Sequence, residues 1–255
     1  MFDIFLSLNM PRFLALILVA VLMVGCAAEP EVPDVSPREF WVAGPIQLKY
    51  AVTGQYQSSP MRGVNGELVW WQNGYGYDAQ LTFEVLRNTI LNQRSTGRIG
   101  PSGIEPEKYS EGRKDESITR FLRDQEKIVF SSNAPSAQLR GGAQDRLSVM
   151  MQLGAILKAN PARYPSGALI SIQTAGLRDA GVWVFVIGED EKMTLPVGEI
   201  VVRKLTRSSR SDVDNKLELW LAPTYGYLPA RFRQTRANGD FADAQLRAVP
   251  ATKAQ

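Results

Sequence analysis

The chain has 255 residues, of which 44% are hydrophobic and 22% charged, and it carries a formal net charge of +3. This composition is typical of a globular protein and excludes both a disordered chain and a multi-span membrane protein. There is no histidine and the one cysteine is Cys26, which excludes Ser/His/Asp and Cys/His catalytic sites, zinc sites built on histidine and cysteine, and disulfides within the chain. We therefore expect no metal and no cofactor.

The N-terminal residues have the pattern of an export signal. Residues 13–24 form an unbroken apolar run, which is too short to span a bilayer stably but suits the hydrophobic region of a signal peptide. Met10-Pro11-Arg12 supplies a short basic segment directly before this run. Of the two candidate start residues, Met1 and Met10, we favour Met10, and we expect the signal peptide to end at residue 25, so that it spans residues 1–25.

Cys26 is the expected site of lipid attachment. Met23-Val24-Gly25-Cys26 resembles the lipobox of bacterial lipoproteins, in which a small residue precedes a cysteine that is acylated and becomes the new N-terminus. Ordinary cleavage before Glu29 is the alternative, because Cys26-Ala27-Ala28 also satisfies the small-x-small rule. We favour the lipoprotein, since the lone cysteine stands at this junction. By resemblance to lipoprotein sorting in Gram-negative bacteria, Ala27 favours the outer membrane.

Residues 26–45 are expected to form an extended tether between the anchor and the domain. The segment contains Pro30, Pro33, Pro37 and Pro45 and few large apolar residues. A flexible coil of this length would hold the domain roughly 25 Å from the anchor, and proline would stiffen and lengthen it.

The next part of the chain has the two-residue period of half-buried β-strands. Apolar and polar residues alternate over residues 46–56 and again over residues 75–85, which predicts strands that each bury one face. Between them, Trp70 and Trp71 point to opposite faces, so at least one should be packed and the other partly exposed. Asn73-Gly74 lies between alternating runs, which is a strong hairpin signal.

Further strands are expected along the rest of the chain. They lie at residues 118–122, 127–130, 168–174, 182–187, 192–195, 200–205, 217–221, 230–234 and 241–246. Turns are expected at residues 124–126 and at Asn238-Gly239. Because most of these strands follow one another directly, they favour antiparallel meanders over βαβ units.

One segment interrupts the series of strands. Residues 145–158 have the pattern of a helix that is apolar around most of its circumference, so it should be covered on several sides. Asp145 is placed to stabilise the helix N-terminus, and Asn160-Pro161 ends the helix. We expect a mainly β domain at residues 46–249, in which a strongly curved antiparallel sheet or half-open β-barrel wraps around this one central helix. A disordered tail, residues 250–255, should follow.

The apolar side chains of this helix are the candidate ligand-contacting residues. Methionine adapts to irregular apolar shapes, and a half-open barrel offers a concave apolar face that could hold an acyl chain. The candidates for lining such a cavity are Leu147, Met150, Met151, Leu153 and Ile156. The alternative is that these residues are plain hydrophobic core.

Three motifs resemble a known bacterial family. They are GIEPEKY at residues 103–109, QDRLS at residues 144–148, and LELWL at residues 217–221 followed by GYLPAR at residues 226–231. They resemble the family called domain of unknown function 3108, and the resemblance covers about residues 48–247. It implies an exported protein with a half-open β-barrel around a helix, similar to periplasmic lipoprotein carriers. It brings no catalytic residues.

Basic residues gather in the last third of the chain. They could bind anionic lipid head groups or cell-surface polysaccharide. With a net charge of only +3, a solvated strand face is the alternative that we favour. The residues concerned are Arg203, Lys204, Arg207 and Arg210 in one run, with Arg231 and Arg233 on one face of a later strand.

Three acidic clusters leave carboxylate chemistry open. They are Glu105 with Glu107, Asp115 with Glu116, and Glu189-Asp190-Glu191. Two carboxylates at the right separation hydrolyse a glycosidic bond without histidine. We expect all three clusters in turns or loops, where acidic residues are common for conformational reasons.

The sequence as a whole indicates a non-catalytic lipoprotein of the Gram-negative cell envelope, facing the periplasm and held in the outer membrane by its lipid. Its single domain would bind or escort a hydrophobic ligand, such as a lipid or a lipoprotein, or an envelope component. The alternative is a structural or interaction subunit that docks on an envelope protein complex, and a carboxylate-based hydrolase is the third interpretation. Export argues against nucleic acid as a partner.

Overall fold

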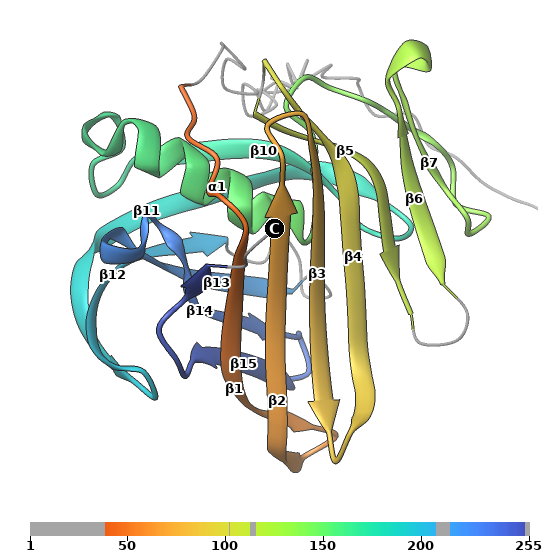
Figure 1. Cartoon of the computed structure of the whole chain (residues 1–255). Coiled ribbons are helices and arrows are strands. Elements are labelled where there is room, and N and C mark those ends of the chain that lie inside the picture. The colour runs from red at the N-terminus through yellow and green to blue at the C-terminus, as the bar shows by residue number, and fades with distance from the viewer. Residues whose placement is uncertain (1–38, 102, 113–115, 208–214, 253–255) are drawn as a thin grey trace, which may run out of the picture. The chain divides into compact units, whose positions relative to one another are not determined.

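A computed structural model describes residues 39–101, 103–112, 116–207 and 215–252. The expected signal peptide, Cys26 and the tether as far as residue 38 lie outside the described residues, as do Asp115 and Arg210. The described residues belong to one compact unit. It consists of a large curved sheet and one α-helix (Figure 1).

The strands of the first half of the chain are long and follow one another through short turns. They are β1 (Ile46–Tyr56), β2 (Ser59–Gln72), β3 (Gly76–Val85), β4 (Asn88–Gly100), β5 (Gly103–Glu111), β6 (Ser117–Leu122), β7 (Lys127–Phe130) and β8 (Ala137–Gln138). The 3-10 turn η1 (Arg123–Gln125) joins β6 to β7, where the sequence predicts a turn.

The second half contains the helix between two sets of strands. Its elements are β9 (Gln144–Asp145), α1 (Ser148–Ala159), η2 (Pro161–Arg163), β10 (Leu169–Ala175), β11 (Ala180–Leu195), β12 (Gly198–Arg207), β13 (Lys216–Ala222), η3 (Pro223–Tyr225), β14 (Leu228–Thr235), β15 (Phe241–Leu246) and β16 (Ala251–Thr252).

All these strands belong to one sheet. Its order is β8-β7-β6-β5-β4-β3-β2-β1-β15-β14-β13-β12-β11-β10-β9, with β16 paired to β1. Neighbours pair antiparallel except β9 and β10, which are parallel, and the pairing of β1 with β15 joins the two halves of the chain. The sheet is curved and unclosed. The predicted fold, a strongly curved antiparallel sheet or half-open β-barrel around one helix, is confirmed.

The helix α1 fills the inner side of this curved sheet. Every residue from Ser148 to Leu157 is buried, as expected for a segment that is apolar around most of its circumference. The sheet contributes the facing side chains, among them Leu48, Tyr50, Leu68, Trp70, Tyr77, Leu81, Phe83, Leu205, Leu219, Phe232 and Leu246. Aromatic contacts link distant strands, with the ring centroids of Tyr50 and Phe232 5.3 Å apart.

The alternating pattern identifies the buried face correctly in the middle of each strand. Trp70 is fully buried and its neighbour Trp71 is 37% exposed, which confirms the prediction that they lie on opposite faces. The pattern fails at strand ends. Tyr56 and Tyr75 continue the apolar alternation in the sequence, yet they are 51% and 83% exposed, because they lie at the turns where the strands extend past the core.

Several elements differ from the sequence-based expectation, and α1 begins at Ser148 instead of at residue 145. β4 and β5 were not expected as strands, and residues 182–195 form one strand, β11, instead of two. A register shift between Ile187 and Asp190 accommodates the polar stretch that suggested a break. At the C-terminus, Ala251 pairs with Gln47 in the short strand β16, so ordered structure extends past residue 249, into the expected tail.

The last residues of the expected tether are attached to the domain. We call residues 39–45 the strap (Figure 1). The Trp41 backbone N–H donates to the carbonyl of Ala155 on α1 at 2.9 Å. The indole N–H of Trp70 donates to the carbonyl of Ala43 at 2.9 Å. The strap is therefore part of the folded domain.

A glycine allows α1 to lie directly against the chain before β14. A Cβ atom at Gly154 would lie 2.5 Å from the carbonyl oxygen of Tyr227. Replacing a glycine in a helix interior with alanine usually stabilises by about 1 kcal/mol, but here the backbone contact should outweigh that gain. We expect Gly154→Ala to lower the free energy of unfolding by about 2 kcal/mol in urea denaturation.

Gly141→Ala is the matched control for this variant. A Cβ atom at Gly141 would meet nothing within 4 Å, so we expect a change within about 0.5 kcal/mol. A Gly154→Ala protein that was more stable than the parent would show that α1 can move away from the sheet at little cost.

Candidate functional site

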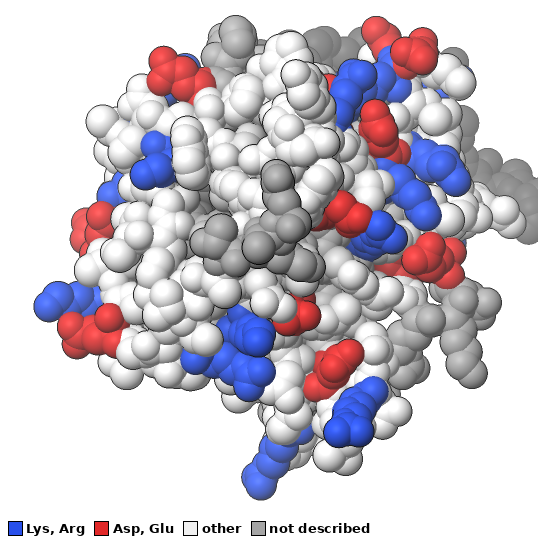
Figure 2. Space-filling model, viewed as in Figure 1, with Lys and Arg blue, Asp and Glu red and all other residues white. Residues whose placement is uncertain are grey.

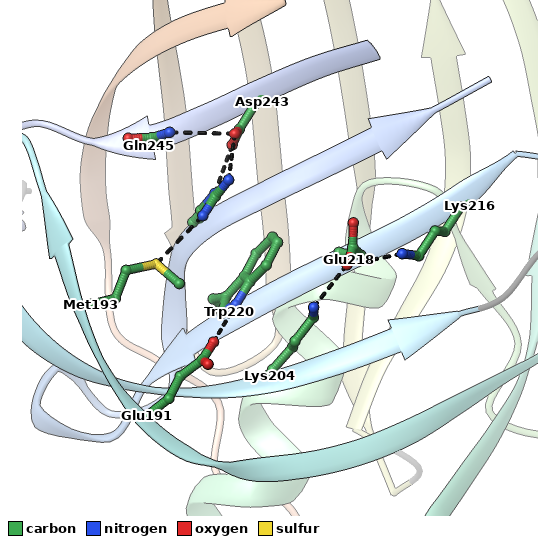
Figure 3. A network of polar contacts seen from close by, with 9 residues as sticks. Glu191, Met193, Lys204, Lys216, Glu218, Trp220, Asp243 and Gln245 are labelled. Atoms are coloured by element: carbon green, nitrogen blue, oxygen red, sulfur yellow. Dashed lines mark hydrogen bonds and ion pairs between the residues drawn. The ribbon is translucent and has the colours of Figure 1, made fainter. Parts of the chain in front are cut away.

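Residues from the sequence motifs gather into two polar clusters. The first lies on strands β11 to β15 (Figure 3). We call it the Trp220 cluster, and it comprises Glu191, Met193, Lys204, Lys216, Glu218, Trp220, Arg231, Asp243 and Gln245. The second surrounds Asp145 beneath the start of α1.

The indole of Trp220 is the centre of the first cluster. The guanidinium carbon of Arg231 lies 4.4 Å from the ring centroid of Trp220, and the Nζ of Lys204 lies 5.0 Å from it. The indole N–H donates to the Oε1 of Glu191 at 2.7 Å. Two cations on the aromatic ring and one acceptor at its N–H fix the indole in position.

Arg231 is held by a bidentate ion pair. Its Nε and Nη2 donate to the two carboxylate oxygens of Asp243 at 2.8 and 2.6 Å. Its Nη1 lies 3.7 Å from the thioether sulfur of Met193. The hydrogen bonds that Arg231 donates to Asp243 raise the pKa of Arg231 against the effect of burial. This is the geometry in which Arg–carboxylate pairs are strongest.

The Trp220 cluster lies on the face of the sheet that points away from α1. Trp220, Arg231 and Asp243 alternate along their strands with Leu219, Phe232 and Ala244, which belong to the core. Trp220 and Asp243 are nevertheless only 4% exposed. A second layer must therefore cover this outer face.

The far end of the β11–β12 hairpin provides that cover. Glu191 and Met193 on β11 reach Trp220 and Arg231 (Figure 3). The N–H of Val197, in the turn between β11 and β12, donates to the carbonyl of Leu246 at the end of β15 at 3.0 Å. The hairpin thus folds back over β13–β15, and the Trp220 cluster connects the two layers.

The remaining charges of the cluster are also paired. Glu218 contacts the Nζ of Lys204 at 2.8 Å and that of Lys216 at 3.0 Å. Burial alone would raise the pKa of Glu218, but the hydrogen bonds from the two lysines outweigh it and lower the pKa. Every carboxylate of the cluster thus has a donor, which suits a structural connection better than a general base.

The second cluster links the start of α1 to the sheet. The Oδ1 of Asp145 accepts hydrogen bonds from the backbone N–H groups of Leu147 and Ser148, both at 2.8 Å. The hydroxyl of Ser95 on β4 donates to Oδ2 at 2.5 Å, and the hydroxyls of Ser95 and Tyr77 lie 2.8 Å apart. The predicted role of Asp145 at the helix N-terminus is confirmed.

Burial has the largest effect on the pKa of Asp145. The residue is fully buried, which raises its pKa to about 6 although its three hydrogen-bond donors favour the ionised form. Such a shift is frequent at catalytic carboxylates. Here the carboxyl is inaccessible to solvent and saturated with donors, so we assign it to the folding of the helix start.

The acidic clusters lie in different places from those expected. Glu105 is on β5 and contacts Arg98 at 2.8 Å and Arg123 at 3.7 Å. Residues 189–191 lie within β11, where Asp190 pairs with Arg203 at 2.6 Å. The expectation that these clusters occupy turns or loops is wrong for both, and each cluster contributes one carboxylate to an ion pair with arginine. Glu116 lies just before β6.

The five candidate cavity residues all lie in the hydrophobic core. Met150 and Met151 are each 4% exposed, and the other three, Leu147, Leu153 and Ile156, are 1% exposed or less. They pack with the inner face of the sheet. Their role as ligand contacts stays a prediction.

The basic residues do not form a solvated strand face. Arg207 is buried, with its guanidinium carbon 4.2 Å from the ring centroid of Trp183. The guanidinium carbon of Arg233 lies 4.0 Å from the ring centroid of Phe241. Arg203, Lys204 and Arg231 are paired with carboxylates, as described above. Sequence reasoning found these cations but missed their partners, Asp243 and Trp220, because cross-strand register decides the pairing.

Among the described residues, no three histidine, cysteine, aspartate or glutamate side chains converge as metal ligands would. Over the same residues, no helix is both long enough and apolar enough to cross a membrane.

Comparisons with known proteins identify a family and a fold. A family model described as "Protein of unknown function (DUF3108)" matches residues 68–247. No curated protein matches the chain. A solved structure of a β-barrel-like protein of domain of unknown function DUF1849 from Brucella abortus is 12% identical, with a TM-score of 0.51, covering 86% of this chain and 100% of that one.

Two further solved structures are more distant. One is a domain from Vibrio parahaemolyticus, provisionally described as an outer membrane lipoprotein-sorting protein domain, with 8% identity and a TM-score of 0.29, covering 82% of this chain and 86% of that one. The other is a protein from Bacteroides fragilis, provisionally described as exported and having a YmcC-like fold, with 9% identity and a TM-score of 0.30, covering 83% of this chain and 98% of that one.

Proposed function

This chain belongs to the DUF3108 family of proteins of unknown function, and on that premise we propose that it is a non-catalytic lipoprotein of the cell envelope. It faces the periplasm, is anchored by lipid on Cys26 in the outer membrane, and binds or escorts a hydrophobic ligand or an envelope component. The observation that carries the proposal is an unclosed sheet whose apolar inner face is covered by a single helix.

The unclosed side of the sheet gives a physical route to ligand binding. β8 and β9 are the two ends of the strand order. Side-chain hydrogen bonds, and not the backbone hydrogen bonds of a strand pairing, connect the residues on either side of this opening. The Thr119 hydroxyl donates to the carbonyl of Gly176 at 2.6 Å, and the Gln173 side chain donates to the carbonyl of Gln138 at 2.8 Å. A few hydrogen bonds are easier to break than a strand pairing, so α1 and this gap can open together.

The inner face would suit an apolar chain once exposed. Met150 and Met151 lie on α1 within the core, and methionine side chains repack readily around irregular apolar ligands. The paired carboxylates of Glu105, Asp190 and Asp243 support a non-catalytic role, because each is held by an arginine.

A specific observation also favours the alternative, an interaction subunit of an envelope complex. Leu169, Val184 and Val186 are 56%, 40% and 42% exposed, and β10 and β11 place Leu169 opposite Val186. Neighbouring exposed apolar side chains are typical of protein contacts.

Native purification from membranes followed by mass spectrometry tests the proposal. We expect a mass on Cys26 that corresponds to acylation, and a co-purifying lipid that a fluorescent fatty acid can replace. A protein that carries no lipid as isolated and binds no fluorescent fatty acid after delipidation would contradict the escort role and favour the interaction subunit.

Cys26→Ser tests the anchor separately. Without the thiol no acyl chain can be attached, so we expect the variant to leave the membrane fraction and to incorporate no labelled palmitate. Ser36→Ala, in the same tether, is the matched control and should stay membrane-bound and labelled. Unchanged membrane attachment of Cys26→Ser would show that the lipobox assignment is wrong.

A further inference from the structure

The strap brings the expected lipid anchor to one defined end of the domain. Glu39, the first described residue, accepts a hydrogen bond from Asn160 at the C-terminal end of α1, at 3.4 Å. Cys26 lies thirteen positions earlier in the sequence. A flexible coil of that length spans about 20 Å. This end of the domain is therefore the part that a lipid on Cys26 would hold nearest to a bilayer.

Exposed aromatic side chains surround the strap. Trp41 is 51% exposed although its backbone is fixed to α1 by the bond to Ala155. Tyr75, in the β2–β3 turn, is 83% exposed, and Trp71 beside that turn is 37% exposed. The side chain of Gln72 donates to the carbonyl of Ala43 at 3.3 Å, so the turn lies next to the strap.

The charges at this end are few, and besides the carboxylate of Glu39 they are exposed cations. The Nζ of Lys158 lies 5.6 Å from the ring centroid of Trp41. Arg163 follows in η2 and is exposed. Figure 2 shows that the surface over α1 and the strap is mostly uncharged, whereas charged side chains gather over β4 to β7.

We propose that this end, comprising Trp41, Trp71, Tyr75, Lys158 and Arg163, rests on the phospholipid bilayer that carries the anchor. Tryptophan and tyrosine are favoured at the membrane–water boundary because their rings are apolar and their edges polar. Lysine and arginine beside them attract anionic head groups. The inference rests on the proposed lipid anchor and adds a fixed orientation, with β1 pointing from the bilayer towards the periplasm.

The orientation is tested by tryptophan quenching in vesicles of phosphatidylethanolamine and phosphatidylglycerol with brominated acyl chains. The acylated protein purified from membranes is reconstituted, and its emission is compared with that in unbrominated vesicles. We expect Trp41 and Trp71 to be quenched, and the double variant Trp41→Phe/Trp71→Phe to lose most of the quenching while remaining bound to the vesicles.

Tyr56 provides a matched control position. It is 51% exposed, like Trp41, but lies at the far end of β1, about 33 Å from the strap for a strand of this length. Adding Tyr56→Trp to the Trp41→Phe/Trp71→Phe protein should restore the lost emission and leave it unquenched.

Two results on vesicle-bound protein would overturn the orientation. One is quenching that the Trp41→Phe/Trp71→Phe variant leaves unchanged, and the other is equal quenching of the indole introduced at Tyr56. A protein that fails to associate with the vesicles would instead overturn the lipid anchor, and with it the inference that depends on it.

Discussion

Replacing Asp243 with alanine is expected to lower the free energy of unfolding by about 3–5 kcal/mol, the usual cost of removing one partner from a buried ion pair. The side chain of Asp243 is 5% exposed and that of Arg231 is 20% exposed. In the variant the guanidinium keeps its contacts with Trp220 and Met193 but loses its bidentate carboxylate partner, and Glu218 and Glu191 balance its charge only through longer-range attraction. Urea denaturation followed by far-UV circular dichroism measures the loss.

An exposed pair of the same geometry is the matched control. Arg94 and Asp78 also form a bidentate contact between neighbouring strands, but their side chains are 54% and 36% exposed. Exposed ion pairs contribute little, so Asp78→Ala should cost less than about 1 kcal/mol. Equal losses in the two variants would mean that the fold-back of the β11–β12 hairpin does not dehydrate the Trp220 cluster.

A second substitution separates charge burial from packing. Adding Arg231→Met to Asp243→Ala removes the unbalanced cation and keeps a long apolar side chain over Trp220. Replacing both members of a buried ion pair by apolar groups is often nearly neutral, so the double variant should recover most of the lost stability. If the double variant did not recover stability, the fold-back of the β11–β12 hairpin would depend on the guanidinium group of Arg231 itself.

The sequence predicts those strands whose two faces have different surroundings. β1 and β3 alternate cleanly, because one face meets α1 and the opposite strands while the other is more exposed to water. β4 and β5 give no such signal. In β4 the one buried side chain is that of Ser95, and β5 contains Pro106, which lies at a register shift against Thr96 and Gly97. In the sequence, a proline inside such a stretch indicates the end of a strand, because the β-bulge that accommodates it cannot be predicted from the residues alone.

The candidate sites were predictable to different degrees, depending on whether the interacting residues are neighbours in the sequence. Asp145 was predicted at the helix start because its hydrogen-bond partners, Leu147 and Ser148, are neighbours in the sequence. Its link to Ser95, fifty positions away, depends on how β4 packs under α1. The Trp220 cluster was not predicted, although Glu191, Lys204 and Arg231 were singled out one by one. It requires both the register of β13 to β15 and the folding back of a hairpin whose first strand, β11, the sequence presents as two short strands.

Asp145 gives the second large expected effect, a dependence of stability on pH. Its pKa is raised by burial from 3.8 in the reference state to about 6 in the folded protein. Between these values the folded state binds a proton that the unfolded state does not, so stability falls as pH rises. The contribution is fully present below pH 3.8 and is lost as pH rises through 6, and the shift corresponds to about 3 kcal/mol.

Asp145→Asn should remove this pH dependence without removing the hydrogen bonds. The amide oxygen can accept from Leu147 and Ser148, and the amide nitrogen can donate to Ser95. We expect urea denaturation at pH 4 and pH 7 to give a difference between the two pH values about 2 kcal/mol smaller in the variant than in the parent, because at pH 4 the carboxyl of the unfolded state is already more than half ionised. If the stability of the two proteins changed with pH in the same way, the pKa of Asp145 would not be raised by burial.

Asp145→Ala distinguishes the hydrogen bonds from the charge. It leaves the backbone N–H groups of Leu147 and Ser148 and the hydroxyl of Ser95 without their acceptor in a buried site. At pH 4, where the parent carboxyl is mostly neutral, the alanine variant should be about 2–4 kcal/mol less stable than the parent. At pH 7 the parent also bears the cost of a buried charge, so the difference between them should shrink. If the deficit were the same at both pH values, ionisation of Asp145 would not be the source of the pH dependence.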